Sequence, residues 1–250
     1  MSGASSPNAG ALRVVSLVPS ATETLVALGV RPVACTRFCE LDGVPTIGGT
    51  KRPDVQAIVD LAPDLVVVND EENRWDDAAA LIDAGLVVHS MSPRSVHDVG
   101  GEVRALAARL DVSVPFPFGA DDWNGWLATI LTPRWYDAFV AVWRRPWMSI
   151  ASDTYGASLL DLLGVGNVFA DAFDRYPEVS LEEVAARAPN LIILPSEPYE
   201  FGPEHAREIE ARVGGVPIVF VDGRDLFWWG IRTPEAAARI AAVLRDAPAG

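Results

Sequence analysis

The sequence predicts an α/β protein with two lobes, each built around a parallel sheet. Apolar runs of strand length alternate with segments of helical periodicity along the chain, which is typical of parallel sheets. A helix–strand unit of the first half recurs in the second half, and a proline-rich break, Pro115–Gly119, separates the two. We therefore expect a first lobe over residues 12–94, a helical connection over 95–131 and a second lobe over 132–250.

The repeated unit is Asp54–Glu72, which aligns without gaps with Ser180–Pro198. Each copy begins with a residue type favoured at helix N-caps and continues with apolar residues at helical spacing. Each helix is expected to stop at Ala-Pro, because the residue before proline is disfavoured in the α region. A buried strand then follows, Leu65–Val68 or Leu191–Leu194. Two units built alike predict a functional cleft between two lobes; the alternative is two α/β layers with no shared site.

Capping residues and glycines mark helix ends in the first lobe. Ser20 with Glu23, and Ser95 with Asp98, have capping-box spacing, and Gly29 follows the first helix as a C-terminal cap. The predicted strands are Val14–Leu17, Val33–Cys35, Leu65–Val68 and Leu86–Val88, and the predicted helices begin at Pro19 and Asp54 and span Arg74–Ala84 and Ser95–Leu110.

The second half repeats this alternation after one short helix. Gly164 ends a predicted helix as Gly29 does, and Pro234 suits the first turn of the final helix. The predicted helices are Asp121–Leu131, a segment from Ser152 to Leu163, one from Ser180, Pro203–Arg212 and one from Thr233; the predicted extended segments are Tyr136–Trp143, Met148–Ala151, Leu191–Leu194 and Ile218–Val221.

Composition excludes several classes of function. The net charge is −14, so no basic surface offsets the repulsion of nucleic-acid phosphates. No apolar run is long enough to span a bilayer. Met1–Ala11 lacks the features of a secretory leader, so the chain as written is expected in the cytoplasm, or outside it if a leader once preceded it. Two cysteines are too few for a disulfide framework or a complete zinc site.

Aromatic and basic residues in predicted loops are the candidates for ligand contacts. Trp228 and Trp229 are adjacent in a loop, so at least one indole should be exposed or line a pocket suited to a planar ligand. The alternative is that they cap the lobe. Arginines such as Arg175 and Arg232 offer bidentate donors to carboxylates or phosphates, or pair with acidic residues of this chain. No histidine-based metal motif and no serine nucleophile elbow occurs.

At these residues the chain resembles the BtuF-like cobalamin- and metal-chelate-binding proteins of ABC importers, also called helical-backbone metal receptors. The resemblance is carried by RVVSLVPSATETLVALG, IGGTKRPDVQAIVDLAPDLVVVNDEENR, SLEEVAARAPNLIILPSEPY and DGRDLFWWGIRTPEA. It implies two Rossmann-like lobes joined by a connecting helix, as in class III periplasmic binding proteins, with a ligand held between them. Within Leu110–Pro133 a helix of at most about 11 residues fits, which is short for that connection.

The same resemblance points by position to a set of ligand-binding residues. Cofactors stay unknown, with cobalamin or another metal chelate as the ligand that the family suggests, and no residue is proposed for a bare metal ion or for catalysis. The implied ligand-binding residues are Ser20, Phe38, Cys39, Thr50, Glu71 and Glu72 in the first lobe and Trp147, Asp153, Tyr155, Arg175, Tyr176, Glu197, Trp228, Trp229 and Arg232 in the second.

Three functional hypotheses follow from the sequence. The first is a non-catalytic solute-binding protein for a corrinoid, haem-like or chelate ligand, with importer components as partners if the chain is exported. The second is a cytoplasmic enzyme that reuses the receptor fold, with Cys39, Asp153 or Glu71 as nucleophile or acid–base group. The third is a scaffold whose acidic surface binds a partner protein.

Overall fold

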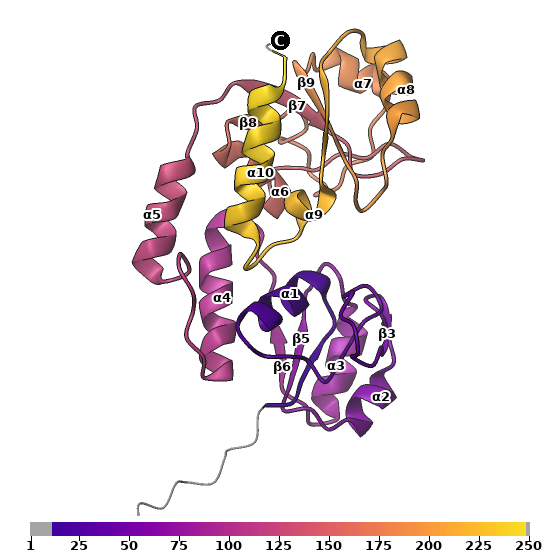
Figure 1. Ribbon diagram of the computed structural model, residues 1–250. Coiled ribbons are helices and arrows are strands. Elements are labelled where there is room, and N and C mark those ends of the chain that lie inside the picture. The colour runs from indigo at the N-terminus through magenta and orange to yellow at the C-terminus, as the bar shows by residue number, and fades with distance from the viewer. Residues whose placement is uncertain (1–11, 249–250) are drawn as a thin grey trace, which may run out of the picture. The chain divides into compact units, whose positions relative to one another are not determined.

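The structure is a computed structural model that describes residues 12–248, so the expectation for Met1–Ala11 lies outside the described residues. The chain forms two compact units (Figure 1). Within the described residues, unit 1 comprises residues 12–92 with Ala108–Val112, and unit 2 comprises Pro93–Ala107 with residues 113–248. Most of the segment expected as a separate connection, 95–131, therefore belongs to unit 2.

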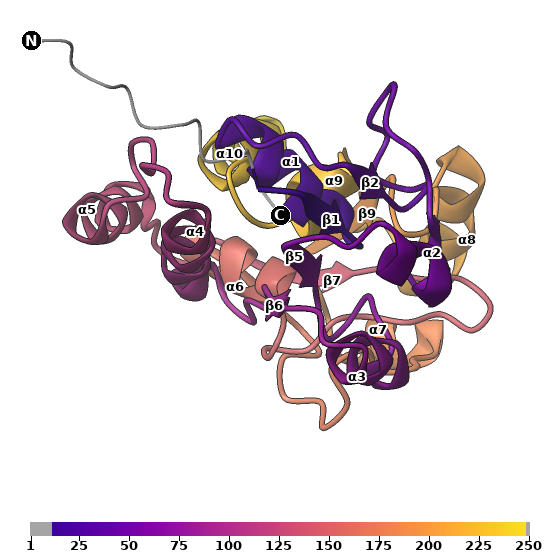
Figure 2. The same ribbon diagram turned by 90° about the horizontal axis from the view of Figure 1, so that it is seen from below.

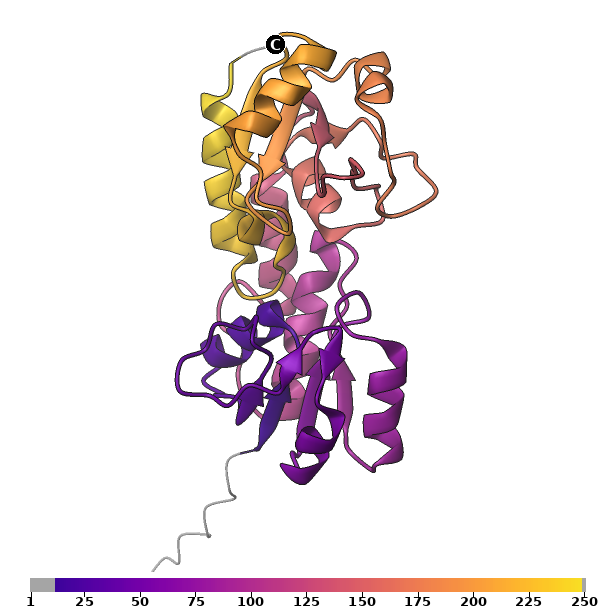
Figure 3. The same ribbon diagram turned by 90° about the vertical axis from the view of Figure 1, so that its right-hand side faces the viewer.

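Unit 1 contains a four-stranded parallel sheet in the order β2-β1-β5-β6. Helix α1 covers one face of this sheet, while α2 and α3 cover the other (Figures 1 and 3). The strands are β1 (Val14–Ser16), β2 (Ala34–Cys35), β5 (Leu65–Val68) and β6 (Val88–Ser90), the hairpin β3 (Gly48–Gly49) and β4 (Arg52–Pro53) precedes α2, and the helices are α1 (Pro19–Ala27), α2 (Val55–Asp60) and α3 (Trp75–Asp83).

Unit 2 contains a second four-stranded parallel sheet, in the order β10-β9-β7-β8. Helices α6 and α10 lie on one face, and α7 and α8 lie on the other (Figures 1 and 2). The strands are β7 (Tyr136–Val140), β8 (Val165–Asn167), β9 (Leu191–Pro195) and β10 (Ile218–Val221), and the helices are α4 (Val96–Leu110), α5 (Ala120–Ile130), α6 (Tyr155–Leu162), α7 (Leu181–Ala186), α8 (Pro203–Val213), α9 (Gly223–Phe227) and α10 (Thr233–Asp246).

The two sheets have the same strand order once their strands are numbered within each unit. In both, the second strand lies at one edge, followed by the first, third and fourth strands. The repeat predicted from the sequence maps onto α2-β5 and α7-β9, so it is confirmed as a structural repeat. Both sheets are covered by helices on both faces, which explains why β5 and β9 are apolar and buried along their whole lengths.

The Ala-Pro signal ends both repeated helices, as predicted, but through a different backbone conformation. Ala62 and Ala188 have φ values of 44° and 47°, in the left-handed region and not in the extended region expected before proline. Each alanine follows the C-cap residue of a six-residue helix. Gly29 and Gly164 end α1 and α6 with the same φ of 82°, which confirms them as C-terminal caps.

Each sheet carries its own apolar core. In unit 1, Val15, Ile58 and Val66 are fully buried, and helices α2 and α3 close over the sheet through Ile58 and Leu81. In unit 2 the corresponding core centres on Phe139 and Ile192 and extends into an aromatic group. The two cores are separate clusters, which agrees with the division of the chain into two units.

Some predicted elements are corrected by the structure. The expected Ser20–Glu23 capping box is absent, because Val18 is the N-cap of α1 and Pro19 occupies its first turn. The N-caps predicted at Asp54 and Ser180 are confirmed, since their side chains accept the N–H of Ala57 and Glu183. No strand forms over the predicted extended segment 148–151, while β8, the β3–β4 hairpin and α9 were not predicted because each is very short.

Helix α4, which has 15 residues, contains a boundary between the units, since residues 96–107 belong to unit 2 and residues 108–110 to unit 1. This corrects the expectation that the connecting helix lies after Leu110 and is short. The proline-broken stretch instead forms α5, which lies beside α4 (Figures 1 and 2). Gly100 of α4 makes this packing possible, since a Cβ at that position would lie 2.5 Å from the Trp123 ring. Trp123 is 2% exposed and stacks on Phe118.

We predict opposite effects for alanine at two adjacent glycines of α4. Gly101→Ala should raise the free energy of unfolding by about 0.5 to 1 kcal/mol, because Gly101 is exposed and alanine is favoured inside helices. Gly100→Ala should lower it by about 1 to 2 kcal/mol, because the new methyl group overlaps the Trp123 ring. Urea unfolding of both variants measures the difference, and equal shifts would contradict the α4–α5 packing.

His89 gives unit 1 a pH-dependent stability. Its side chain is buried in β6, and among the described residues its Nε2 has no hydrogen-bond partner. Burial, and then the charge of Arg109, lower the pKa of His89 below its usual 6.5. The unfolded chain therefore binds a proton at a higher pH than the folded chain does. Folded stability should be complete above about pH 6.5 and fall as the pH drops from there to the lowered pKa.

The measurement is urea unfolding at pH 7.5 and pH 5.5 for the wild type and for His89→Asn. The variant should lose less stability between these pH values than the wild type does. His97→Asn, at an exposed position of α4, should behave as the wild type. An unchanged pH dependence in His89→Asn would contradict the prediction.

Candidate functional site

The strand order places a candidate site at the carboxyl edge of each sheet. Open parallel sheets bind ligands beyond the carboxyl ends of their strands, where the chain connections diverge to opposite sides. In unit 1 this point lies between β1 and β5, and in unit 2 between β7 and β9. The loops that follow the strands at this edge therefore contain the residues to consider in each unit.

In unit 1, two buried asparagines fix the loop after β5. The Oδ1 atom of Asn69 accepts the N–H groups of Glu71 and Glu72 at 2.8 and 2.9 Å. Asn73 accepts the N–H of Asn69 through its Oδ1 at 2.9 Å and donates from Nδ2 to the Thr50 carbonyl at 2.9 Å. The loop with the predicted acidic residues is thus held against the turn that contains Thr50. Sequence reasoning missed both asparagines, although the pattern of Asn directly after a buried strand is visible.

The acidic residues of this loop differ in surroundings. Burial among neighbouring protein atoms raises the pKa of Glu72 above that of a free glutamate, while the nearby charge of Lys51 opposes the shift. Glu72 still keeps solvent contact, and Lys51 donates a hydrogen bond to the Glu71 carbonyl. The structure therefore brings both predicted glutamates to the carboxyl edge of unit 1.

Of the other predicted residues of unit 1, Phe38 is the most accessible. It is 48% exposed, and the Arg37 guanidinium lies over its ring at 4.7 Å. Ser20 is 5% exposed and Thr50 is 8% exposed, so neither offers much side-chain surface. Cys39, which the resemblance points to, is 8% exposed, and its sulfur lies 3.2 Å from the Thr36 hydroxyl. This burial removes the leading nucleophile of the enzyme hypothesis.

In unit 2, a half-buried tryptophan follows α9, between two arginines. The guanidinium carbons of Arg224 and Arg232 lie 5.1 and 5.3 Å from the centre of the Trp228 ring. Its neighbour Trp229 is 6% exposed. Trp229 is therefore buried and Trp228 is half-buried, and the predicted role of these indoles in a ligand pocket stays a prediction.

A buried carboxylate positions one of these arginines, Arg232. Asp225, which is 3% exposed, accepts two hydrogen bonds from Arg239, from Nε at 2.6 Å and from Nη2 at 2.7 Å. It also accepts one from Arg232 at 3.3 Å. Hydrogen bonding to Asp225 raises the pKa of Arg239, so this guanidinium stays charged at every accessible pH. The ion pairs hold Arg232 beside Trp228.

Glu197 reaches the same edge from the end of β9. Its carboxylate accepts a hydrogen bond from Arg224 Nε at 3.1 Å. Gly223 begins α9 directly against the backbone of Glu197, where a Cβ would lie 2.3 Å from the Glu197 nitrogen. Arg224 therefore contacts both Glu197 and Trp228, and Arg232 lies on the same indole; that these residues form a ligand site stays a prediction.

Two predicted ligand contacts are corrected to packing roles. Trp147 is 8% exposed and stacks on Phe201 with ring centres 5.7 Å apart, inside the core of unit 2. Tyr155 is 5% exposed, and its hydroxyl forms a 3.0 Å hydrogen bond with Thr233 of α10. Burial raises the pKa of Tyr155, so it stays protonated. Both side chains lie within the unit because residues distant in sequence cover them.

The loops on either side of α6 place a charged group near the surface. Asp153 forms ion pairs with Arg94 at 3.1 Å and with Arg175 at 3.3 Å, and its carbonyl accepts a hydrogen bond from Arg175 Nε at 2.6 Å. Tyr176 is 37% exposed, and the Arg175 guanidinium lies 5.9 Å from its ring centre. A carboxylate in two ion pairs is poorly suited to act as a base, which further weakens the enzyme hypothesis.

An aromatic group that the sequence analysis missed lies after β7 and β9. Trp143, which is 42% exposed, contacts Tyr199 edge-to-face at 5.4 Å, and Tyr199 contacts Phe201 at 4.8 Å. His205 fixes this group, since its Nδ1 accepts the Gly202 N–H at 2.9 Å and its Nε2 hydrogen-bonds the Tyr199 hydroxyl at 3.2 Å. An aromatic residue shortly after each of two buried strands is the signal that could have identified it.

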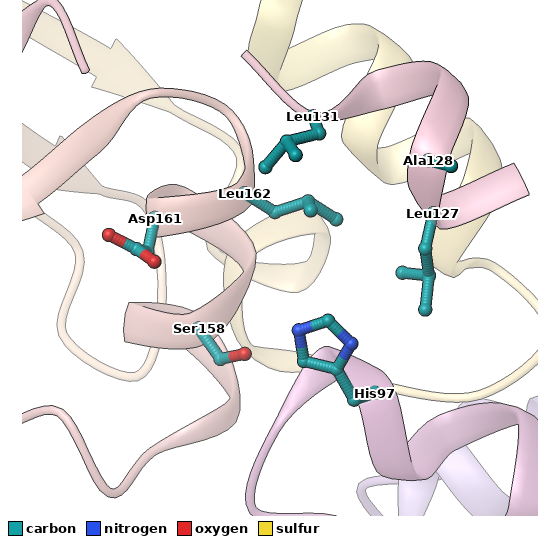
Figure 4. Close-up of a pocket in the computed structure, with 7 residues that line it drawn as sticks. All are labelled: His97, Leu127, Ala128, Leu131, Ser158, Asp161 and Leu162. Atoms are coloured by element: carbon teal, nitrogen blue, oxygen red, sulfur yellow. The ribbon is translucent and has the colours of Figure 1, made fainter. Parts of the chain in front are cut away.

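A groove of about 240 Å³ in unit 2 lies elsewhere, among α4, α5 and α6 (Figure 4). Its volume is below the range usual for sites of drug-sized molecules, and therefore too small for a macrocycle. None of the predicted ligand-binding residues borders it, so it does not coincide with either carboxyl edge. Its lining residues are His97, Leu127, Ala128, Leu131, Ser158, Asp161 and Leu162.

Metal and membrane features were sought within residues 12–248. Over this range no three His, Cys, Asp or Glu side chains gather as a bound metal ion would need. In the same part of the chain, no helix has both the length and the apolar character needed to cross a bilayer.

Comparison with known proteins adds to this geometry. No family model matches the chain. A periplasmic vitamin B12-binding protein of Vibrio cholerae, BtuF, superposes with a TM-score of 0.76 at 20% identity, over 93% of this chain and 96% of that chain. The chain has the fold of class III periplasmic binding proteins. The predicted fold class is therefore confirmed, including its two lobes and connecting helix.

Two further matches extend the resemblance. A periplasmic haem-binding protein, BhuT, solved with two haems, superposes with a TM-score of 0.76 at 21% identity, over 95% of this chain and 99% of that chain. In sequence, a vitamin B12-binding protein of Vibrio parahaemolyticus is 25% identical over 193 residues, which cover 72% of this chain and 69% of the relative. The resemblance to BtuF-like binding proteins inferred from sequence motifs is confirmed by both kinds of comparison.

Proposed function

We propose that this chain is a solute-binding protein of an ABC importer that holds a corrinoid, haem-like or other metal-chelate ligand. The observation that carries the proposal is the aromatic–arginine group at each carboxyl edge. Phe38 with Arg37 provides it in unit 1, and Trp228 with Arg224 and Arg232 provides it in unit 2.

The chemistry of these groups suits a flat macrocycle with a polar rim. An indole or phenyl face covers planar apolar area, and arginine donates paired hydrogen bonds to carboxylates, phosphates or amide oxygens. Corrinoids and haems combine such a plane with such substituents. The names of the similar proteins, which bind vitamin B12 or haem, support the same class of ligand.

The proposal includes a location and a partner. Similar proteins are described as periplasmic, which supports an extracytoplasmic location in place of the cytoplasmic one expected from the sequence as written. Binding proteins of this fold class deliver ligands to importer components, so those components are the proposed partners.

The experiment is a titration of the purified chain with vitamin B12, haem and ferric chelates, followed by tryptophan fluorescence and by ligand absorbance. Micromolar or tighter binding of one of them, with one ligand per chain, is the expected result. The absence of binding by all three classes would overturn the proposal. No structural observation favours the enzyme alternative, because Cys39 is buried and Asp153 is held in ion pairs.

A further inference from the structure

The two loops that flank the divergence point of unit 2 each carry an aromatic side chain for which sequence reasoning predicted no role. Trp143 follows β7 and is 42% exposed, and Tyr199 follows β9 and is half-buried. Their rings meet edge-to-face with centres 5.4 Å apart. Ligands of open parallel sheets bind between two such loops, where the chain connections diverge to opposite faces. The pair therefore lies where a ligand of unit 2 is expected.

A hairpin and an ion pair hold Trp143 in place. The Val142 N–H donates to the Met148 carbonyl at 2.9 Å, and the Met148 N–H donates to the Trp143 carbonyl at 3.1 Å. Arg144 then joins this hairpin to α8, since its Nε and Nη2 donate to the Glu208 carboxylate at 3.0 and 2.6 Å. An aromatic side chain on an anchored hairpin loses little conformational freedom when a ligand covers it.

His205 of α8 holds Tyr199 through both of its ring nitrogens. Nδ1 accepts the Gly202 N–H at 2.9 Å, so the ring proton lies on Nε2 and is donated to the Tyr199 hydroxyl oxygen at 3.2 Å. The His205 and Tyr199 rings also meet edge-to-face, with centres 5.3 Å apart. The hydroxyl proton of Tyr199 is then available to an acceptor such as an amide or carboxylate oxygen of a ligand.

The loop after β9 also connects this aromatic pair to Trp228. Glu197, two residues before Tyr199, accepts a hydrogen bond from Arg224 Nε at 3.1 Å. The Arg224 guanidinium carbon lies 5.1 Å from the centre of the Trp228 ring. Aromatic side chains therefore follow β7, β9 and β10, so three of the four strands of this sheet contribute to one carboxyl edge.

We propose that Trp143 and Tyr199 form a second aromatic contact for the ligand in unit 2, and that His205 is the residue that positions Tyr199. The inference rests on the proposed function and adds a requirement to it: the ligand presents one flat face to several aromatic groups. A corrin or porphyrin ring has such a face, whereas a ferric chelate without a macrocycle does not.

The first test removes the exposed indole. Trp143→Ala should bind vitamin B12 or haem, whichever the wild type binds, about 10-fold more weakly. Trp143→Phe should keep most of the affinity, because an aromatic plane remains. Trp135→Ala is the matched control, since Trp135 is 64% exposed just before β7, at the other end of the same strand, and should bind as the wild type does. Calorimetric titration gives the affinities, and urea unfolding checks that the variants are folded.

The second test separates positioning of Tyr199 from stabilisation of α8. Glutamine at the third position of a helix can also accept the N–H of the N-cap residue, so His205→Gln should keep α8 capped. This variant loses the bond to Tyr199 and should bind the ligand about 3- to 10-fold more weakly. With Tyr199→Ala already present, His205→Gln should have no further effect on affinity. Equal losses in the two backgrounds would contradict the positioning role.

The outcomes distinguish this inference from the function on which it rests. If the wild type binds vitamin B12 or haem, equal affinities for Trp143→Ala and Trp135→Ala would overturn the inference alone. A wild type that binds only ferric chelates would also overturn it, because those ligands lack the macrocyclic plane, and the proposed function would stand. Failure of all three ligand classes to bind would overturn the proposed function and this inference with it.

Discussion

A Trp228→Ala variant is expected to bind the ligand identified by titration about 10- to 100-fold more weakly than the wild type, which is the range for a buried aromatic contact. Trp228 is half-buried at the carboxyl edge of unit 2, and two guanidinium groups fix its ring. Removing the indole removes planar contact area for the macrocycle. It also takes away the surface against which Arg224 and Arg232 are oriented.

Trp135→Ala is the matched control for this variant. Trp135 is 64% exposed and precedes β7, so it lies at the amino end of the same sheet. The affinity of the Trp135→Ala variant for the ligand should equal that of the wild type. Calorimetric titration of the three proteins gives the comparison, and urea unfolding checks that both variants are folded. Equal affinities for Trp228→Ala and Trp135→Ala would place the ligand away from the proposed edge.

Replacing Asp225 with alanine is expected to lower the free energy of unfolding by about 2 to 4 kcal/mol. Its carboxylate is nearly inaccessible and joins α9 to α10 through Arg239, with a further bond to Arg232. Without the carboxylate, Arg232 keeps a positive charge in a site where only 16% of its side chain is exposed. Arg239 is half-exposed and can be hydrated, which limits the loss.

The control for Asp225→Ala is Glu235→Ala, because Glu235 also pairs with Arg239. Glu235 lies 3.5 Å from Arg239 and is 82% exposed, so Glu235→Ala should cost less than about 0.5 kcal/mol. Urea unfolding followed by circular dichroism measures both variants. Similar losses of unfolding free energy in the two variants would contradict the prediction that burial makes the Asp225–Arg239 ion pair strong. Ligand affinity of a still-folded Asp225→Ala should also fall, because Arg232 is no longer held beside Trp228.

Much of the fold could be predicted because local signals and the global arrangement agree. Strand β5 matches its predicted bounds, since four consecutive apolar residues before an Asn are recognisable in sequence. The repeat also predicted that β9 and α7 would resemble β5 and α2. What failed were elements of two to five residues, such as β8 and α9, whose hydrogen bonds depend on a neighbouring strand or helix and leave little periodic pattern.

The candidate site was predictable in part. Trp228, Glu197 and Arg232 do come together, because loops after parallel strands share one edge of a sheet. Trp147 and Cys39 were predicted as ligand-binding residues in loops, yet both are buried. A loop position in the sequence does not determine exposure when a residue far along the chain covers the side chain, as Phe201 does for Trp147.

The sequence by itself determined the duplicated α/β unit, the two parallel sheets and the likeness to chelate-binding receptors. These depend on periodicity, helix caps and motif spacing, which are local properties of the chain. Only the tertiary structure decided that both sheets share one strand order, that α4 is the connecting helix, and which aromatic side chains stay accessible. Those outcomes depend on contacts between residues that are distant in sequence, and such contacts leave no local pattern.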